Sequence, residues 1–396
     1  MMMAESGAAS SGVVNNEGND VLSLVENYDW AGAIARIQQF PHESQAVGER
    51  GRTPLHVACD HDAPAEVIQL LIQAYPEAAL HVGTTGMNPL HIACSSEHAS
   101  EEVVRILLVE TAKANLAKQV CSMKDVDLDT PLHSACRCGA SLNVLRLLML
   151  VYPDAVHQRD YEGLTPLLRL WVREYFLLGD EVIHGVTGPE SLTGELGEAW
   201  NKTMMLLYCA YIGSLKPPTT RTTGTATAAA AASSSSSTNN NHKVFRPLHA
   251  FAAIDCPRRV VKIATKVYRD QMLERDENGM TPLLVACQAP VYKFQDISHD
   301  GDDLEDMLED HLYAEEEDAE MSYKEDPNKT LPSVIEILLE AEPSAAKIAD
   351  PSGKLPLQHA IDSGKSSNQG VKALSEAEGL EQKLEKSLKI VADDSM

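Results

Sequence analysis

Aromatic and basic residues are both scarce in this sequence. Phe, Trp and Tyr make up 5% of the 396 residues, although hydrophobic residues of all types reach 44%. A core must therefore consist mainly of aliphatic and small side chains, which suits closely packed helices. Lys and Arg number 33 against 58 Asp and Glu, which gives a formal net charge of −25. Binding to nucleic acid or to an anionic membrane requires a basic surface, so we expect neither partner.

Long apolar segments are absent as well. No run approaches the roughly 18 apolar residues that a membrane span needs, and Arg146 interrupts the nearest candidate. Met1 to Gly18 is polar and lacks the basic start and apolar stretch of a signal peptide. The eight cysteines mostly occupy one recurring motif position, which favours reduced core residues over a disulfide framework. We expect a soluble intracellular protein, in the cytoplasm, the nucleus or both.

Catalytic motifs are also lacking. The sequence contains no G-x-S-x-G nucleophile motif, no phosphate-binding glycine loop and no H-E-x-x-H metalloprotease motif. We therefore predict that the protein is not an enzyme, and that it has no catalytic residues, no cofactor and no metal site.

What the sequence does contain is one short motif, repeated seven times. Three full copies begin at Thr53, Asn88 and Thr130 and read T/N-P-L-H-x-A-C; shorter copies contain Pro166, Pro247, Pro282 and Pro356. Thr or Asn is a good N-cap, because its side chain accepts a hydrogen bond from a free N–H of the first turn. Proline suits the next position, where its missing N–H would have no helical partner anyway. Each copy therefore predicts the start of a helix.

The spacing of the copies is regular. Pro54 to Pro89, Pro131 to Pro166 and Pro247 to Pro282 each span 35 residues, and the three other intervals are longer by 7, 46 and 39 residues. The longer intervals indicate insertions. A period of about 33 residues with a T-P-L-H-x-A signature resembles the ankyrin repeat.

This resemblance implies an all-α ankyrin-repeat solenoid of stacked helix-turn-helix units, with about seven repeats and a cap at each end. We expect a disordered N-terminus over residues 1–18, and the N-terminal cap and repeats one to four over residues 19–215. A disordered insert rich in Thr, Ala, Ser and Asn should follow over residues 216–243. Repeats five to seven and a C-terminal cap helix should occupy residues 244–396, interrupted by an acidic disordered insert over residues 290–329.

Two regions depart from the repeat pattern. Asn19 to Phe40 predicts a helix pair without the Pro-Leu signature, which we interpret as the N-terminal cap; the alternative is that Trp30 is a docking anchor. In repeats four and five, Leu170, Trp171 and Phe251 stand where other repeats have Ala or Cys. These bulky residues predict a stack that is kinked or partly divided between the two repeats. The second helix of repeat four is expected at about Glu195–Ile212.

The resemblance also implies where a partner would bind. In ankyrin-repeat proteins the contacts lie on a concave face, at variable positions just before the Pro and just after the Ala-Cys. Carried onto this sequence, the partner-binding residues are Glu49, Arg50, Arg52, Asp60, His61, Thr84, Thr85, Met87, Ser95, Ser96, Asp127, Asp129, Arg137, Tyr161, Glu162 and Leu164. Tyr161, Glu162 and Leu164 form the group most similar to an interface hot spot, because tyrosine is enriched there. Leu128 replaces the family glycine before Thr130, which leaves the geometry of that turn open.

Two patterns in the sequence partly resemble metal-binding motifs. His56 and Cys59 form H-x-x-C, a spacing that recurs in repeats two and three, but copies on successive repeats would not converge on one ion. We interpret the histidines as hydrogen-bonding to neighbouring turns and the cysteines as core residues. Residues 296–307 partly match a calcium loop, but the twelfth position is Met307 rather than Glu. Weak binding of divalent cations by this carboxylate-rich segment remains an alternative.

The features together predict a non-catalytic scaffold or adaptor that binds a protein partner, of unknown identity, through the concave repeat surface. We expect the chain to be a monomer. An alternative function is electrostatic regulation. The segment from Asp296 to Asp326 holds 15 acidic residues and one lysine, so it would capture basic proteins or cations while the repeats present it.

Overall fold

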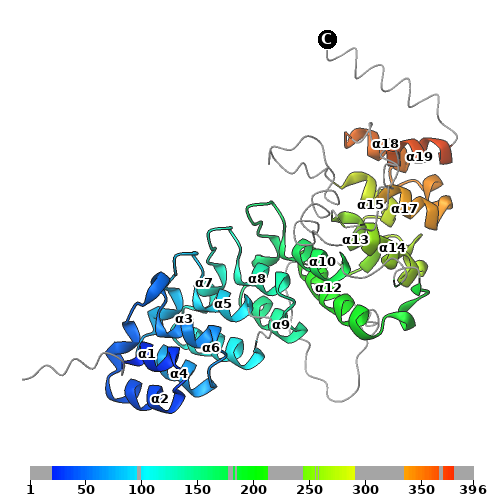
Figure 1. Ribbon diagram of the computed structural model, residues 1–396. Coiled ribbons are helices and arrows are strands. Elements are labelled where there is room, and N and C mark those ends of the chain that lie inside the picture. The colour runs from blue at the N-terminus through cyan, green and yellow to red at the C-terminus, as the bar shows by residue number, and fades with distance from the viewer. Residues whose placement is uncertain are drawn as a thin grey trace, which may run out of the picture. The chain divides into compact units, whose positions relative to one another are not determined.

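The computed structural model describes residues 20–95, 100–176, 182, 185–212, 244–254, 256, 258–289, 334–364 and 369–378. None of these residues lies in a β-strand, so the described fold is all-α (Figure 1). The chain divides into two compact units, unit 1 from Met1 to Val126 and unit 2 from Asp127 to Met396. The N-terminal segment 1–18, the insert 216–243 and the acidic insert 290–329 fall outside the described residues, as do residues 379–396 at the C-terminal end of the predicted cap-helix region.

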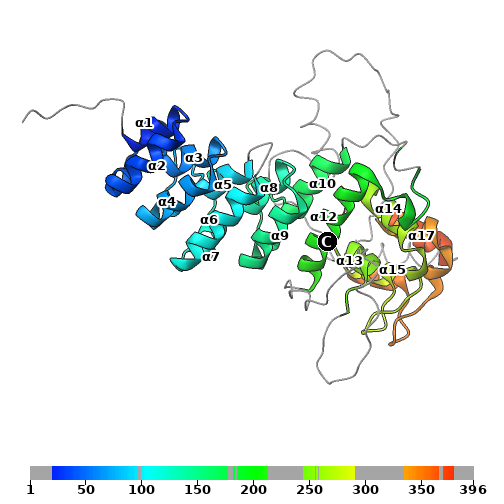
Figure 2. The ribbon, with the colours of Figure 1, turned by 90° about the horizontal axis from the view of Figure 1, so that it is seen from below.

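Unit 1 contains three successive helix pairs and one additional helix. The helices are α1 (Val21–Glu26), α2 (Trp30–Gln39), α3 (Pro54–Asp60), α4 (Ala65–Ala74), α5 (Pro89–Ser95), α6 (Glu101–Lys113) and α7 (Ala117–Ser122). First helices pack on first helices, α1 on α3 and α3 on α5, while α2 packs on α4 and α4 on α6 (Figure 2). The pair α1–α2 packs on repeat one, which confirms the predicted helix pair at residues 19–40. Trp30 is half-buried, with its ring edge-on to Tyr28, and its role as a docking anchor stays a prediction.

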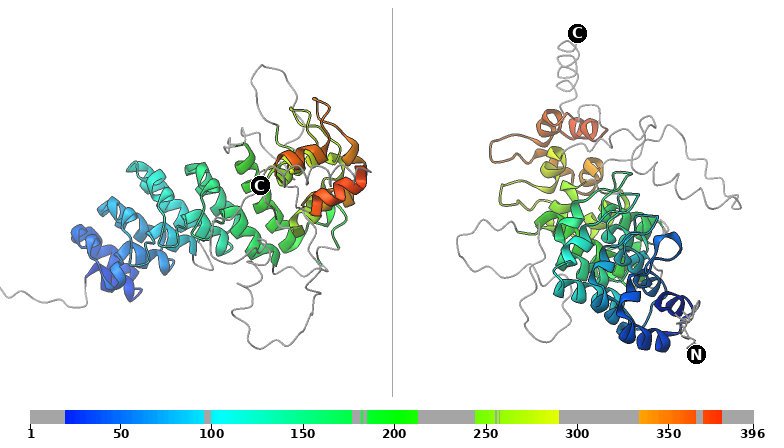
Figure 3. Two further views of the ribbon diagram at one scale, coloured as in Figure 1. Left: turned by 90° about the horizontal axis from the view of Figure 1, so that it is seen from above. Right: turned by 90° about the vertical axis from the view of Figure 1, so that its left-hand side faces the viewer.

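Unit 2 continues the plan with helices α8 (Pro131–Arg137), α9 (Leu142–Val151), α10 (Pro166–Phe176), α12 (Gly194–Ile212), α13 (Pro247–Ala253), α14 (Arg258–Val267), α15 (Pro282–Gln288), α17 (Val334–Ala341), α18 (Pro356–Asp362) and α19 (Gln369–Glu378). In its C-terminal half α13, α15 and α18 pack in one row and α14, α17 and α19 in the other. The orange and red helices α17, α18 and α19 lie together in Figure 3. The predicted displacement of the second helix of repeat four is confirmed by α12.

Helix starts agree with the motif at every copy, because α3, α5, α8, α10, α13, α15 and α18 each begin at the motif proline. The cap itself varies. Asn88, Thr165 and Thr281 accept a hydrogen bond from a backbone N–H of the first turn, as predicted. At Thr53 and Thr130 the hydroxyl instead faces the Nδ1 atom of the motif histidine, at 2.8 and 2.9 Å.

A second recurring element ends the second helices. In three repeats the chain leaves the helix at Tyr75, Tyr152 or Glu342, and a short 3₁₀ helix then begins at Pro76, Pro153 or Pro343. Proline lacks the N–H that would continue the helix. The alanine two residues after each proline is buried, so the element both stops the helix and fills the space beneath it.

The junction between repeats four and five is irregular. Elsewhere in unit 2 first helices pack on first helices, but here α13 packs mainly on α12, the second helix of repeat four, and α14 contacts α10, the first. Buried aromatic rings occupy this junction: Trp171 donates from Nε1 to the hydroxyl of Thr203, and the Trp200 and Phe251 ring centroids are 5.5 Å apart. The predicted interruption of regular stacking is therefore found among the described residues. Both repeats belong to unit 2.

Cysteine burial agrees with the sequence analysis. All eight cysteines are free thiols; Cys138 is half-buried and the other seven are buried. Burial raises the pKa of the Cys121 and Cys209 thiols to about 12, so they stay protonated at neutral pH and do not react as thiolates.

Candidate functional site

The loops that enter the first helices contain a five-residue turn. In residues 48–52, 83–87, 160–164, 276–280 and 350–354 the first N–H bonds to the fifth C=O. The fourth residue of each turn is a glycine with positive φ. These glycines are Gly51, Gly86, Gly163, Gly279 and Gly353. Asp160, Asp276 and Asp350 begin three of these turns and accept a hydrogen bond from the fifth N–H at 2.9, 2.7 and 2.8 Å. This D-x-x-G pattern is visible in the sequence and was not recognised there.

Backbone hydrogen bonds join successive turns within each unit. In unit 1, Thr84 N–H donates to the carbonyl of Arg50 at 2.9 Å, and Val126 N–H donates to the carbonyl of Thr85 at 3.2 Å. In unit 2, Tyr161 N–H donates to the carbonyl of Asp127 at 2.9 Å. These bonds hold the turn tips of consecutive repeats side by side. We call the exposed side chains of the turns, together with the adjoining first helices, the turn face.

Leu128 occupies the glycine position in the turn between repeats two and three. Its φ is +59°, in the left-handed region that costs roughly 1–2 kcal/mol for an L-residue. Leu128→Gly removes this strain and loses little burial, since the side chain is 46% exposed. Because glycine also increases unfolded-state entropy, we expect a net gain of about 0.5–1 kcal/mol, measured by urea denaturation. A matched Gly163→Ala change at φ +80° should destabilise, and an unchanged or lowered midpoint for Leu128→Gly would refute the strain.

The motif histidines join one repeat to the next turn. His56 Nδ1 accepts the Thr53 backbone N–H at 3.1 Å, so the proton resides on Nε2, which donates to the Met87 carbonyl at 3.3 Å. His133 repeats the arrangement with the Leu164 carbonyl at 3.2 Å, and His249 Nε2 lies 2.9 Å from the Met280 carbonyl. The interpretation of these histidines as structural hydrogen-bonding residues is confirmed.

Acid should weaken this link. Desolvation lowers the pKa of His56 from 6.5 to about 4, so the folded protein keeps the ring neutral while the unfolded chain takes up a proton. The stability that this provides is fully present above pH 6.5 and is lost as the pH falls toward 4, a change of about 3 kcal/mol. Urea denaturation between pH 4.5 and 7 should show a flatter pH dependence for His56→Gln than for the wild type. Exposed His157→Gln is the control, and equal slopes for all three proteins would contradict the assignment.

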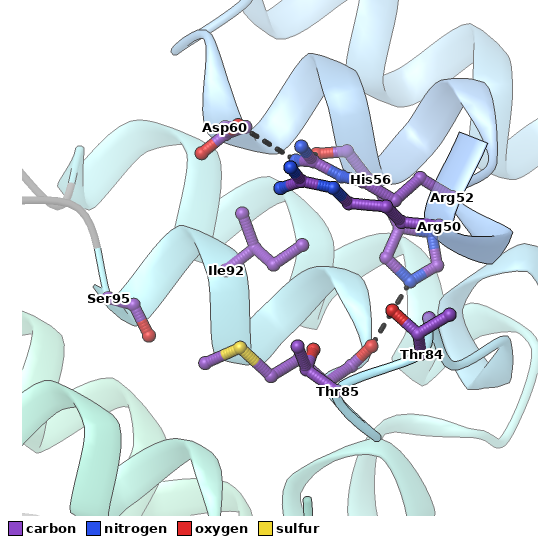
Figure 4. A pocket seen from close by; sticks show the side chains of 10 residues that line it. Arg50, Arg52, His56, Asp60, Thr84, Thr85, Ile92 and Ser95 are labelled. Carbon is purple, nitrogen blue, oxygen red and sulfur yellow. Dashed lines mark hydrogen bonds and ion pairs between the residues drawn. The ribbon is translucent and has the colours of Figure 1, made fainter. Parts of the chain in front are cut away.

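A hollow of about 240 Å³ lies on the turn face of unit 1. It is lined by Arg50, Arg52, His56, Asp60, Gly83, Thr84, Thr85, Met87, Ile92 and Ser95. These residues come from the turn 48–52, from α3, from the turn 83–87 and from α5, which places two consecutive repeats around one space. Arg52 and Arg50 extend toward Asp60 in Figure 4, and the His56 ring points to the turn.

The hollow combines charge with an apolar surface. Arg52 forms an ion pair with Asp60 at 2.8 Å and also reaches the His56 carbonyl at 3.4 Å. Arg50 is exposed and adopts a positive φ of 57°. His56 adds no charge at neutral pH because its pKa is lowered. The net charge of the lining groups is therefore positive.

Seven of the predicted partner-binding residues line this hollow: Arg50, Arg52, Asp60, Thr84, Thr85, Met87 and Ser95. Glu49, Asp127 and Tyr161 are exposed elsewhere, and His61 and Arg137 are half-buried. Ser96 lies outside the described residues. His56, Gly83 and Ile92 also line the hollow but were not predicted from the sequence. Ile92 occupies the variable x of the P-L-H-x-A motif, and that position could have indicated it.

Three predicted partner-binding residues have buried side chains, contrary to the exposure expected of partner contacts: Asp129, Glu162 and Leu164. Asp129 pairs with Arg137 at 2.8 Å, and Glu162 pairs with Arg169 at 2.9 Å. Leu164 lies beneath its turn and is 2% exposed. Within the predicted hot-spot group only Tyr161 has an exposed side chain.

The comparison with known families identifies the type of helical repeat. A family model for ankyrin repeats, in three copies, matches residues 13–119. Residues 13–119 of this chain are ankyrin repeats. No curated protein matches its sequence. The matched range lies in unit 1, and unit 2 repeats the same proline-started helices and five-residue turns. Ankyrin repeats generally mediate protein–protein interactions and are typically non-catalytic.

One cluster in unit 2 has the composition of a metal site. Atoms of Asp129, His133 and Asp160 able to ligate an ion lie within 4.8 Å of one another, and all three residues are buried. Two guanidinium groups already face the carboxylates: Arg137 lies 2.8 Å from Asp129, and Arg169 lies 2.6 Å from Asp160. The two arginines therefore already supply the positive charge that a metal ion would bring to these carboxylates.

The histidine of the cluster is engaged as well. His133 Nδ1 accepts the Thr130 N–H, and Nε2 faces the Leu164 carbonyl. A metal ion would have to break these hydrogen bonds and displace Arg169. The geometry therefore favours a buried ion-pair network over a metal site.

None of the helices that the structure describes is long and apolar enough to cross a lipid bilayer.

Proposed function

We propose that this ankyrin-repeat protein is a non-catalytic scaffold or adaptor that binds a protein partner through its turn face. The observation that supports this most strongly is the hollow on unit 1, where side chains of two repeats and of the turn between them surround one space. Backbone hydrogen bonds between successive turns hold these side chains in fixed register, which lowers the entropy cost of binding.

The turn face has the composition of a recognition surface. Tyr161 is 55% exposed, and its hydroxyl donates a hydrogen bond to Glu162, which raises the pKa of Tyr161 to about 12. The tyrosine therefore stays neutral at neutral pH. Leu128 is also exposed, so an apolar and an aromatic side chain lie on adjoining turns of unit 2. Aromatic anchors of this kind dominate many protein interfaces.

Co-precipitation with the tagged full chain tests the proposal. Tyr161→Glu and Thr84→Glu change exposed turn residues and should each weaken capture of the partner several-fold. Leu150→Glu introduces the same charge at an exposed position of α9, a second helix, and should leave capture unchanged. Loss of capture with Leu150→Glu alone would overturn the proposal.

The alternative, electrostatic regulation by the acidic segment, is separated by deleting Gln295–Asp326. The scaffold predicts the same captured partners with and without this segment. The regulator predicts that basic partners or cations are lost, while Tyr161→Glu and Thr84→Glu have no effect.

A further inference from the structure

The hollow on unit 1 is a positively charged site in a strongly acidic protein. Arg50, Arg52 and Asp60 are its charged lining groups, while the whole chain carries a formal charge of −25. Asp60 neutralises one arginine only. A local positive site held against such a background points to a ligand of negative charge.

Both arginines have N–H groups that donate no hydrogen bond. Among the described residues Arg50 has no ion pair or side-chain hydrogen bond, and the Nε atom of Arg52 is buried without an acceptor. A buried donor without a partner carries a free-energy cost. An oxygen acceptor that enters the hollow would remove this cost and at the same time meet the exposed guanidinium of Arg50. Guanidinium groups bind carboxylates and phosphates through such paired donors.

The charge of the ligand distinguishes a carboxylate from a phosphate at this site. With Asp60 in place, the hollow has an excess of one positive charge, which matches a single carboxylate. A phosphorylated side chain carries about −1.5 to −2 charges, and it would face the Asp60 carboxylate at close range. Phosphate sites also use clusters of arginines without a competing carboxylate. The hollow is therefore suited to an Asp or Glu side chain.

The remaining lining residues indicate what lies beside the carboxylate. Met87 and Ile92 provide an apolar surface, and Thr84, Thr85 and Ser95 provide hydroxyl groups. Ser95 donates its proton to the His91 carbonyl at 2.7 Å, so its oxygen is left to accept. At about 240 Å³ the space is smaller than the roughly 300–1,000 Å³ of sites for drug-sized ligands. It therefore suits anchoring side chains of a peptide better than a cofactor.

We infer that this hollow binds an acidic peptide segment of a protein partner, in which an Asp or Glu carboxylate meets Arg50 and Arg52 and a neighbouring apolar side chain contacts Met87 and Ile92. The inference rests on the proposed function, because it names the partner chemistry of the same turn face.

Selection from a displayed library of random seven-residue peptides on the immobilised full chain tests this inference. Enriched peptides should carry Asp or Glu within two positions of Leu, Ile, Met or Phe. Enrichment of peptides without an acidic residue, or no enrichment at all, would overturn the inference.

Fluorescence polarisation with the best selected peptide gives the second measurement. Arg50→Gln should raise its Kd at least about tenfold, which corresponds to about 1.4 kcal/mol, and replacing the peptide's acid by its amide should do the same. The two losses should not add, because they remove the same contact. Arg146→Gln, at an exposed position of α9, is the matched control. Equal Kd values for Arg50→Gln and Arg146→Gln, or tighter binding of the phosphoserine version of the peptide, would refute the inference.

The two proposals fail differently. If Tyr161→Glu and Thr84→Glu abolish partner capture but no acidic peptide is selected, the partner uses the turn face and the carboxylate site is wrong. If capture is insensitive to both turn variants, the proposed function itself is wrong.

Discussion

Replacing Arg169 by methionine should lower the free energy of unfolding by about 3–5 kcal/mol, the cost of removing one partner of a buried ion pair. The side chain of Arg169 is 11% exposed and contacts Asp160 at 2.6 Å and Glu162 at 2.9 Å. Methionine keeps much of the volume but leaves two buried carboxylates without their cation. Chemical denaturation of both proteins followed by circular dichroism measures the difference.

The pH dependence identifies the cause of this loss. In the Arg169→Met protein the buried carboxylates can take up protons, so the loss should be smaller at pH 5 than at pH 8. The control is Arg146→Met, an exposed position where we expect a change within about 0.5 kcal/mol. A loss for Arg169→Met that is the same at both pH values would indicate lost packing rather than unpaired charge.

Leu55→Ala should destabilise unit 1 by about 2–5 kcal/mol, as expected for a buried leucine. Leu55 follows the motif proline, is fully buried, and lies in α3, which packs between α1 and α5. The truncation leaves a cavity among three first helices, and the repeats on either side lose contact with it. The measurement is the midpoint and slope of urea denaturation.

Leu150→Ala is the matched control, because Leu150 lies in a helix but is 49% exposed. We expect a change within about 0.5 kcal/mol there. Equal losses at Leu55 and Leu150 would contradict the assignment of the motif leucine to a core shared by neighbouring repeats.

The sequence predicted the helices well because local signals determine their ends. Proline at the first position begins helices as predicted, and Tyr-Pro or Glu-Pro at the close ends them within a few residues. The extra residues between Pro89 and Pro131 were predicted only as an insertion. The structure places helix α7 there, and a helix of six residues leaves too short a pattern to recognise.

The irregular junction was predicted for the right reason but with incomplete geometry. Trp171 and Phe251 were visible as bulky residues at alanine or cysteine positions. At this junction α13 packs on α12, the second helix of repeat four, and the Trp200 ring of α12 contacts Phe251 of α13. Helix α12 is itself displaced by an insertion. No local pattern indicates which helix such a ring will contact.

The candidate site was predicted in part. The family positions located seven residues of the hollow, but the same rule also selected Asp129, Glu162 and Leu164, which are buried. Whether a residue next to a turn points outward depends on the D-x-x-G geometry and on partners such as Arg169. The positive charge of the hollow could not be predicted, because Asp60 lies eight residues beyond Arg52 and pairs with it only in the folded repeat.

Site-specific photo-crosslinking tests the central claim, recognition through the turn face, most directly. A photoreactive amino acid placed singly at Thr84, Tyr161 or exposed Leu150 is activated in the presence of the captured partner. The account predicts crosslinks from Thr84 or Tyr161 and none from Leu150. Crosslinks from Leu150, with none from either turn position, would contradict it.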